Sequence, residues 1–166
     1  MKRSLDFVFV SQCLLAQGIR AQKIVKHYPS VVNPLIDFLQ NENVNIIPLE
    51  CPEILYEGYY RQPGFERYVS DPNYKEHCGS LAMEVNRKKN ILTKGNELKL
   101  LGVIGVAGSP SCAVRKLNYR LGKKGKGVFM KQLSILIKTS FLEFDSYLQK
   151  KTMEEIKKKI KKNKRR

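Results

Sequence analysis

The chain has 166 residues, of which 42% are hydrophobic and 28% are charged. This length suits a single domain with a real apolar core, and no apolar run reaches the ~18–20 residues that a bilayer-spanning helix needs. Four cysteines are too few for a disulfide scaffold of this size. The net charge of +16 is uneven, because residues 150–166 carry half of it.

The first residues resemble the start of a signal peptide, since Lys2 and Arg3 precede a largely apolar stretch. Asp6 and Gln12 interrupt that stretch, and no cleavage pattern of small residues follows. We therefore expect a cytoplasmic protein without membrane association, in which the cysteines are reduced thiols.

Short runs rich in β-branched and aromatic residues predict strands, and apolar residues at helical spacing predict helices. The predicted strands are residues 5–10, 44–49, 100–107 and 141–147, the last at a sheet edge. The predicted helices are residues 31–41, 72–94 and 128–138. The tyrosine-rich segment 56–74 predicts a long surface loop, and the Lys-Gly segment 122–127 predicts another.

Strands that alternate with helices are typical of an α/β fold with a mainly parallel sheet. We expect a single three-layer domain over residues 1–148, Rossmann-like or flavodoxin-like. Residues 149–166 would follow as a basic tail, either a fraying helix or disordered. Such a tail can solubilise the protein or add weak, salt-sensitive affinity for nucleic acid.

Three cysteines, Cys13, Cys51 and Cys112, directly follow predicted strands. Ligands of parallel α/β sheets gather at the carboxyl ends of strands, so these thiols are expected on one edge. Their spacing is too wide for a zinc ribbon, and thiolates without histidines favour an iron–sulfur cluster. Each could instead be a small buried apolar residue. Cys78 lies on an apolar helix face and is expected in the core.

The short motifs around these cysteines resemble the signature of the thiouracil desulfurase family. The motifs are Val10-Ser11-Gln12-Cys13-Leu14-Leu15, Cys51-Pro52-Glu53 and Ser109-Pro110-Ser111-Cys112. The resemblance implies an α/β fold and a [4Fe-4S] cluster held by Cys13, Cys51 and Cys112. It also implies that an open iron takes the sulfur of a thiolated pyrimidine, releasing uracil and sulfide. The chain departs from the family pattern at three positions, Gln12, Ala16 and Ala113.

Acid–base chemistry near such a cluster needs a carboxyl group, and Glu53 is the first candidate, with Glu50 as the alternative. A helix or loop cap is the competing role for Glu53. Ser109 and Ser111 are candidate catalytic residues that could orient the substrate by hydrogen bonds. Turn formation beside Pro110 explains these serines equally well.

Candidate substrate-binding residues are Ser11, Arg61 and Arg67. The arginines lie among tyrosines, and could hold an anionic or carbonyl-bearing substrate while a tyrosine stacks on its ring. The more usual role of such arginines is in a solvated loop.

Two functions follow from these patterns. The first is a [4Fe-4S]-dependent enzyme, a desulfurase that removes sulfur from a thiolated small molecule. The alternative is a basic nucleic-acid-binding module whose cysteines only pack, or a hybrid that acts on thiolated nucleosides in RNA. The Lys-Gly segment before the helix at 128–138 adds a possible phosphate site.

Overall fold

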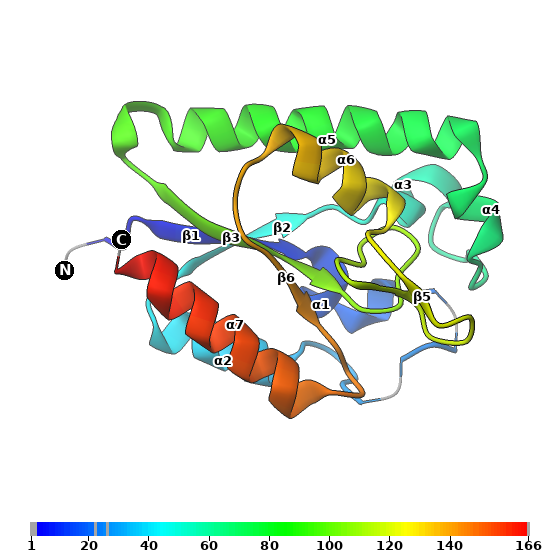
Figure 1. Ribbon diagram of the computed structural model, residues 1–166, viewed down its shortest axis with the longest axis horizontal. Coiled ribbons are helices and arrows are strands. Elements are labelled where there is room, and N and C mark those ends of the chain that lie inside the picture. Colours follow the sequence, from blue (N-terminus) through cyan, green and yellow to red (C-terminus); the bar gives the residue numbers. More distant parts are fainter. Residues whose placement is uncertain (1–2, 22, 26, 166) are drawn as a thin grey trace.

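The computed structural model describes residues 3–21, 23–25 and 27–165, and its centre is a sheet of parallel strands (Figure 1). The strand order is β2-β1-β3-β6. The strands are β1 (Asp6–Ser11), β2 (Asn45–Leu49), β3 (Lys99–Val106) and β6 (Phe141–Phe144). This confirms the predicted α/β fold, and the order agrees with the first four strands of a flavodoxin-like sheet.

Helices cover both faces of the sheet, which makes three layers (Figure 1). One face carries α5 (Pro72–Leu92) and α6 (Val128–Leu136), and the other carries α2 (Asn33–Asn41) and α7 (Gln149–Lys164). Because helices cover both faces, the inner strands are apolar throughout, and Phe7, Val8, Phe9 and Val10 of β1 have no exposed surface.

The strand register brings the carboxyl ends of the strands to one edge of the sheet. Ser11 at the end of β1 pairs with Leu49 at the end of β2. On the other side, Val10 pairs with Ile104 of β3, which ends two residues later at Val106. The segments after these strands therefore begin side by side.

The long helix α5 begins where the sequence predicts. Asp71 caps it, since its carboxylate accepts the backbone N–H of Asn73 at 2.9 Å, and Pro72 fits the first turn. Gly95, with a φ of 71°, lies just beyond its end.

Several short elements accompany the main helices and strands. The helices α1 (Gln12–Leu15) and α3 (Pro52–Glu57) follow β1 and β2 directly, and the 3₁₀ turns η1 (Gln17–Ile19) and η2 (Lys94–Asn96) are as short. The segment expected as a long loop contains α4 (Glu66–Val69) between the ends of α3 and α5. Strands β4 (Lys116–Asn118) and β5 (Lys123–Lys124) form an antiparallel hairpin that includes part of the Lys-Gly segment.

Of the two alternatives predicted for the basic tail, the structure has the helix, but one that packs on the core rather than frays. Over Gln149–Lys164 it is the helix α7, whose apolar side chains pack on the sheet with the core residues of β1, β3 and α2. The buried side chains are Thr152, Met153, Ile156 and Ile160. These few apolar residues recur at helical spacing among the lysines, so α7 extends the domain beyond the boundary predicted at residue 148.

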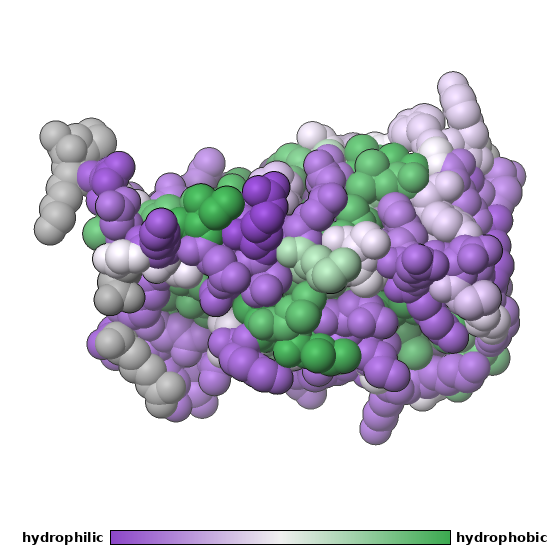
Figure 2. Space-filling model, turned by 90° about the horizontal axis from the view of Figure 1, so that it is seen from above, coloured by the Kyte–Doolittle hydropathy of each residue, from purple (hydrophilic) through white to green (hydrophobic). Residues whose placement is uncertain are grey.

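The outer surface of the helical layer is mixed. Seen from the α5 side, it is mainly hydrophilic with separate hydrophobic areas (Figure 2). The exposed large apolar side chains of α5 and α6 are Met83, Ile91, Ile135 and Leu136. In the described part of the chain, no helix has the length and apolar character that would let it cross a membrane.

Candidate functional site

Three cysteines lie just beyond the carboxyl ends of three neighbouring strands. Cys13 is in the first turn of α1, directly after β1, and Cys51 is the N-cap residue of α3, directly after β2. Both are partly exposed, whereas Cys112, in the loop after β3, is 7% exposed. We refer to Cys13, Cys51 and Cys112 as the cysteine rim.

The thiols of the cysteine rim are close enough to influence one another electrostatically. Burial raises the pKa of Cys112 well above its usual value, and negative charge on Cys13 or Cys51 raises it further. Burial also raises the pKa of Cys13 to about 12, and Cys51 adds to that shift. The side chain of Gln12 joins the first two turns, because its Oε1 accepts the backbone N–H of Cys51 at 3.1 Å.

The loop that carries Cys112 is held tightly between β3 and α6. The Cys112 carbonyl accepts the N–H of Val106 at 2.9 Å. A Cβ at Gly105 would lie 2.3 Å from that carbonyl oxygen, and a Cβ at Gly127 would lie 2.4 Å from the carbonyl carbon of Ser111. Both positions therefore require glycine for the close approach of the loop backbone.

Two side chains shape this loop by accepting backbone N–H groups. Ser109 Oγ accepts from Ser111 at 3.2 Å and from Cys112 at 2.9 Å, which is turn chemistry. The buried carboxylate of Glu143, on β6, accepts from three consecutive residues further along the loop, Val114, Arg115 and Lys116. Ser109, predicted as catalytic, thus has a structural role in the loop.

Glu53 lies at the cysteine rim, where it pairs with Arg61 beside Cys51. Its negative charge raises the pKa of Cys13, Cys51 and Cys112, in each case as a smaller contribution than burial. Ser111 Oγ donates to Glu53 Oε1 at 2.8 Å. The structure therefore brings Glu53 and Ser111 together with the three thiols.

Tyr74 completes this hydrogen-bond chain, a role that no pattern in the sequence indicated. Its hydroxyl lies 2.6 Å from Ser111 Oγ, and its ring is fully buried. Helical spacing indicated only an apolar position. Cys78, one turn further on α5, has no exposed surface and lies in the same core cluster, as predicted.

Arg61 is also at the cysteine rim, and it is buried rather than solvated. Its side chain is 2% exposed, and its Nε lies 3.3 Å from Glu53 Oε2. Its Nη2 donates to the Ile19 carbonyl at 3.0 Å and lies 3.5 Å from Cys51 Sγ. Its Nη1 is buried without a hydrogen-bond partner among the described residues.

Ser11 has a similar unpaired atom. Its Oγ is buried and makes no hydrogen bond of standard geometry within the described part of the chain. The hydroxyl nevertheless faces the Cys112 thiol and lowers its pKa, against the larger effect of burial. Unpaired buried polar atoms are rare in proteins and call for an explanation such as a bound group.

The other predicted residues lie elsewhere. Arg67 contacts Glu57, the Gln62 carbonyl and the Tyr68 hydroxyl, and so stabilises the segment between α3 and α4. Glu50, the alternative to Glu53, lines a groove of about 220 Å³ beside α5. Neither is among the residues grouped around the three thiols.

The Lys-Gly segment does not leave a phosphate site at the start of α6. The backbone N–H groups of Val128 and Met130 donate to the carbonyls of Pro110 and Ser111, at 2.8 and 3.1 Å. The N–H groups that would bind an anion are therefore largely occupied by the Cys112 loop.

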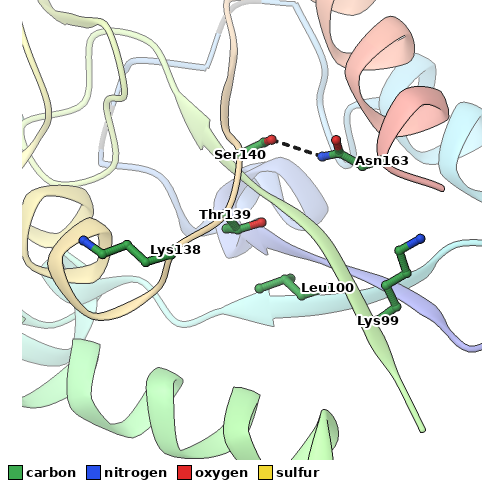
Figure 3. Close-up of a pocket in the computed structure, with 6 residues that line it drawn as sticks. All are labelled: Lys99, Leu100, Lys138, Thr139, Ser140 and Asn163. Atoms are coloured by element: carbon green, nitrogen blue, oxygen red, sulfur yellow. Dashed lines mark hydrogen bonds between the residues drawn. The ribbon is translucent and has the colours of Figure 1, made fainter. Parts of the chain in front are cut away.

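A shallow pocket of about 450 Å³ lies at the opposite edge of the sheet (Figure 3). Its lining residues are Lys99, Leu100, Lys138, Thr139, Ser140 and Asn163. Asn163 Nδ2 donates to Ser140 Oγ at 3.0 Å and to the Leu101 carbonyl at 2.7 Å. This pocket is at the start of β3 and before β6, away from the thiols, and its amide is already paired.

Among the described residues, no group of three or more His, Cys, Asp or Glu side chains is arranged to hold a metal ion. A cubane cluster separates its ligand sulfurs more widely than a single ion does. Comparison of the chain with protein-family models, curated proteins and solved structures found no match. The functional argument therefore rests on the geometry of the rim.

Proposed function

We propose that the chain binds a [4Fe-4S] cluster through the cysteine rim and removes sulfur from a thiolated, thiopyrimidine-like small molecule. The observation that carries this proposal is that three thiols follow three adjacent strands at one edge of the sheet, where Arg61 contacts both Cys51 and Glu53. The resemblance of the motifs to thiouracil desulfurases agrees with it.

The residues of the rim suit such a cluster. Three soft thiolates are the donors that iron–sulfur clusters use. Arg61 supplies positive charge at Cys51, and Arg20 does so at Cys13, where it lowers the pKa against burial. The Ser11 hydroxyl and Arg61 Nη1, which have no partner of standard geometry in the part of the chain that the structure describes, are available as donors to a bound group.

Burial keeps the free thiols protonated, and a bound cation favours their ionised form. When bound by three thiolates, the cluster supplies one open iron that acts as a Lewis acid towards a substrate sulfur. The remaining chemistry belongs to side chains of the chain.

In this proposal Glu53 takes a proton from the attacking water. Its two carboxylate oxygens are held by different partners, Ser111 at Oε1 and Arg61 at Oε2. Tyr74 fixes Ser111 from the protein interior. Replacement of the carbon–sulfur bond by a carbon–oxygen bond uses one water and releases hydrogen sulfide, so no oxidant or reductant is needed.

The test compares two glutamates of the same helix. Glu53 and Glu57 are both in α3 and each pairs with an arginine, Arg61 or Arg67, but only Glu53 lies at the rim. After anaerobic reconstitution, sulfide release from 2-thiouracil is measured for wild type, E53Q and E57Q.

We expect E53Q to lose about 10²–10⁴-fold in kcat with its iron content unchanged, since this is the usual contribution of a general base. E57Q should stay within a few-fold of wild type. Wild-type turnover by iron-loaded E53Q would refute the assignment of Glu53, and an inactive but iron-loaded wild type would refute thiouracil-like substrates.

A further inference from the structure

We propose that the surface around the cysteine rim binds a single strand of RNA and presents one of its bases to the rim. The presentation of a base rests on the proposed function, whereas binding of the strand does not. We define the rim surface by its exposed tyrosines and basic side chains: Tyr59, Tyr60, Tyr119, Tyr147, Arg120 and Lys124.

Positive charge gathers in the part of the chain that carries the third cysteine. Residues 98–142 contain basic residues but no aspartate or glutamate. The β4–β5 hairpin exposes several of them, Arg120 in its turn and Lys123 and Lys124 in β5. A surface of this kind attracts phosphate groups and gives salt-dependent binding.

The hairpin lies at the carboxyl edge of the sheet, next to the rim. Gly108 N donates to the Lys116 carbonyl at 2.7 Å, so β4 is joined to the end of β3. On the other side, Lys123 Nζ lies 3.3 Å from a carboxylate oxygen of Glu66 in α4. Figure 1 shows β5 at the same end of the molecule as α1, α3 and α4.

Exposed tyrosine pairs lie on both sides of the rim. Tyr59 and Tyr60 follow α3, on the β2 side, with 56% and 80% of their surface exposed and ring centroids 5.2 Å apart. Tyr119 and Tyr147 lie on the β6 side, also with centroids 5.2 Å apart. A Cβ at Gly108, near the end of β3, would lie 2.6 Å from the Tyr119 ring.

These features together match how proteins hold single strands. Such sites combine a basic surface that follows the backbone with aromatic rings on which bases stack. The sheet between the two tyrosine pairs is about 14 Å wide, from four strands at ~4.8 Å spacing, which is more than one base needs. A free thiopyrimidine has no phosphates, so it gives no reason for the exposed basic hairpin.

The test measures fluorescence anisotropy of a labelled oligouridine with the full chain over a range of salt concentrations. The variant R120Q/K124Q removes two charges from the hairpin. The matched control K158Q/K162Q removes two exposed charges from the C-terminal half of α7, where Asn163 and Lys164 contact the amino edge of the sheet.

The slope of log K against log salt is negative, and we expect R120Q/K124Q to make it shallower by about 1.4. This corresponds to two lost phosphate contacts at ~0.7 each for a single strand. K158Q/K162Q should change the slope by less than half of that. Equal changes in the two variants would overturn the proposal, because they would show an effect of net charge alone. Equally tight binding of polyglutamate would also overturn it, by indicating an acidic protein partner.

Stacking is tested separately at Tyr60, which is exposed enough for substitution without loss of fold. Y60A should weaken oligouridine binding roughly tenfold, and Y60F should not, because stacking uses the ring and not the hydroxyl. Unchanged binding by Y60A would contradict the assignment of the tyrosines. These measurements use protein with and without iron, and strand binding should be the same in both. Retained binding by a protein that cannot be loaded with iron would refute the proposed function while supporting this surface.

Discussion

The two edges of the parallel sheet differ in how their polar groups are satisfied. At the amino edge, the pocket of Lys99, Ser140 and Asn163 is shallow, and the Asn163 amide pairs with Leu101 and Ser140. At the carboxyl edge, Ser11 Oγ and Arg61 Nη1 are buried beside thiols and have no hydrogen-bond partner within residues 3–21, 23–25 and 27–165.

This difference indicates which edge is prepared for a bound group. Burying a polar atom without a partner costs free energy, roughly 1–3 kcal/mol for each group. At the amino edge the Asn163 amide is paired, so this cost does not arise for it. Its hydrogen bond to the Leu101 carbonyl joins α7 to β3. At the carboxyl edge this free-energy cost falls where three cysteines and Glu53 meet. Ligands of parallel α/β sheets bind at this edge, and strain is often stored at such sites.

The largest expected effect is the loss of iron when a cysteine of the rim, but not a cysteine of the core, is replaced. Cys112 and Cys78 are both buried, and alanine removes the same sulfur from each. C112A should lose nearly all iron and the visible absorption of the thiolate–iron bonds after anaerobic reconstitution, whereas C78A should keep both. Iron analysis checks this, and equal retention of iron by the two variants would contradict a cluster at the rim.

A smaller effect is expected from the glycines that shape the edge. G105A places a Cβ against the Cys112 carbonyl, so it should lower the free energy of unfolding by about 1–3 kcal/mol and reduce iron loading. The control is G79A in the middle of α5, where a Cβ would have no neighbour within 4 Å. G79A should raise stability by about 0.5–1 kcal/mol and leave iron unchanged.

Urea unfolding followed by circular dichroism measures both glycine variants. If G105A were as stable as wild type, the tight approach of the Cys112 loop to β3 would be incorrect. A loss of iron in G79A would show that loading follows general changes in the fold rather than the geometry of this loop.

The smallest effect is expected at the amino edge. N163A removes the hydrogen bonds to Leu101 and Ser140, so it should cost about 1 kcal/mol in urea unfolding, with iron content and 2-thiouracil turnover unchanged. A strong loss of turnover in folded N163A would mean that the two edges are coupled, against the distinction made here.

The strands and the cysteines were predictable because both depend on local pattern. Apolar runs with β-branched residues predicted all four strands of the sheet, and the parallel order then put Cys13, Cys51 and Cys112 at one edge. The long helix α5 was equally clear from its Asp71 cap and the Gly95 stop.

Contacts between distant segments were not predictable from the pattern. Gln12 stood out only as a departure from a family signature, yet its side chain accepts the N–H of Cys51. Tyr74 looked like an apolar helix position, and only the fold brings its hydroxyl to Ser111. Arg61 and Arg67 had the same local surroundings in sequence, but Arg61 alone is buried at the rim.

The packing of residues 149–164 on the sheet was missed for a different reason. The lysines of residues 150–166 dominate the composition of this segment, and the apolar stripe that packs on the sheet consists of few residues. Truncation there would remove core side chains, so it would test stability rather than nucleic-acid binding.

The most direct measurement is iron and acid-labile sulfide analysis of anaerobically purified full-length protein. A cubane cluster at the cysteine rim predicts about four irons and four sulfides per chain, with visible absorption that is lost in C112A. Colourless protein whose four cysteines all titrate as free thiols after anaerobic reconstitution would contradict the account.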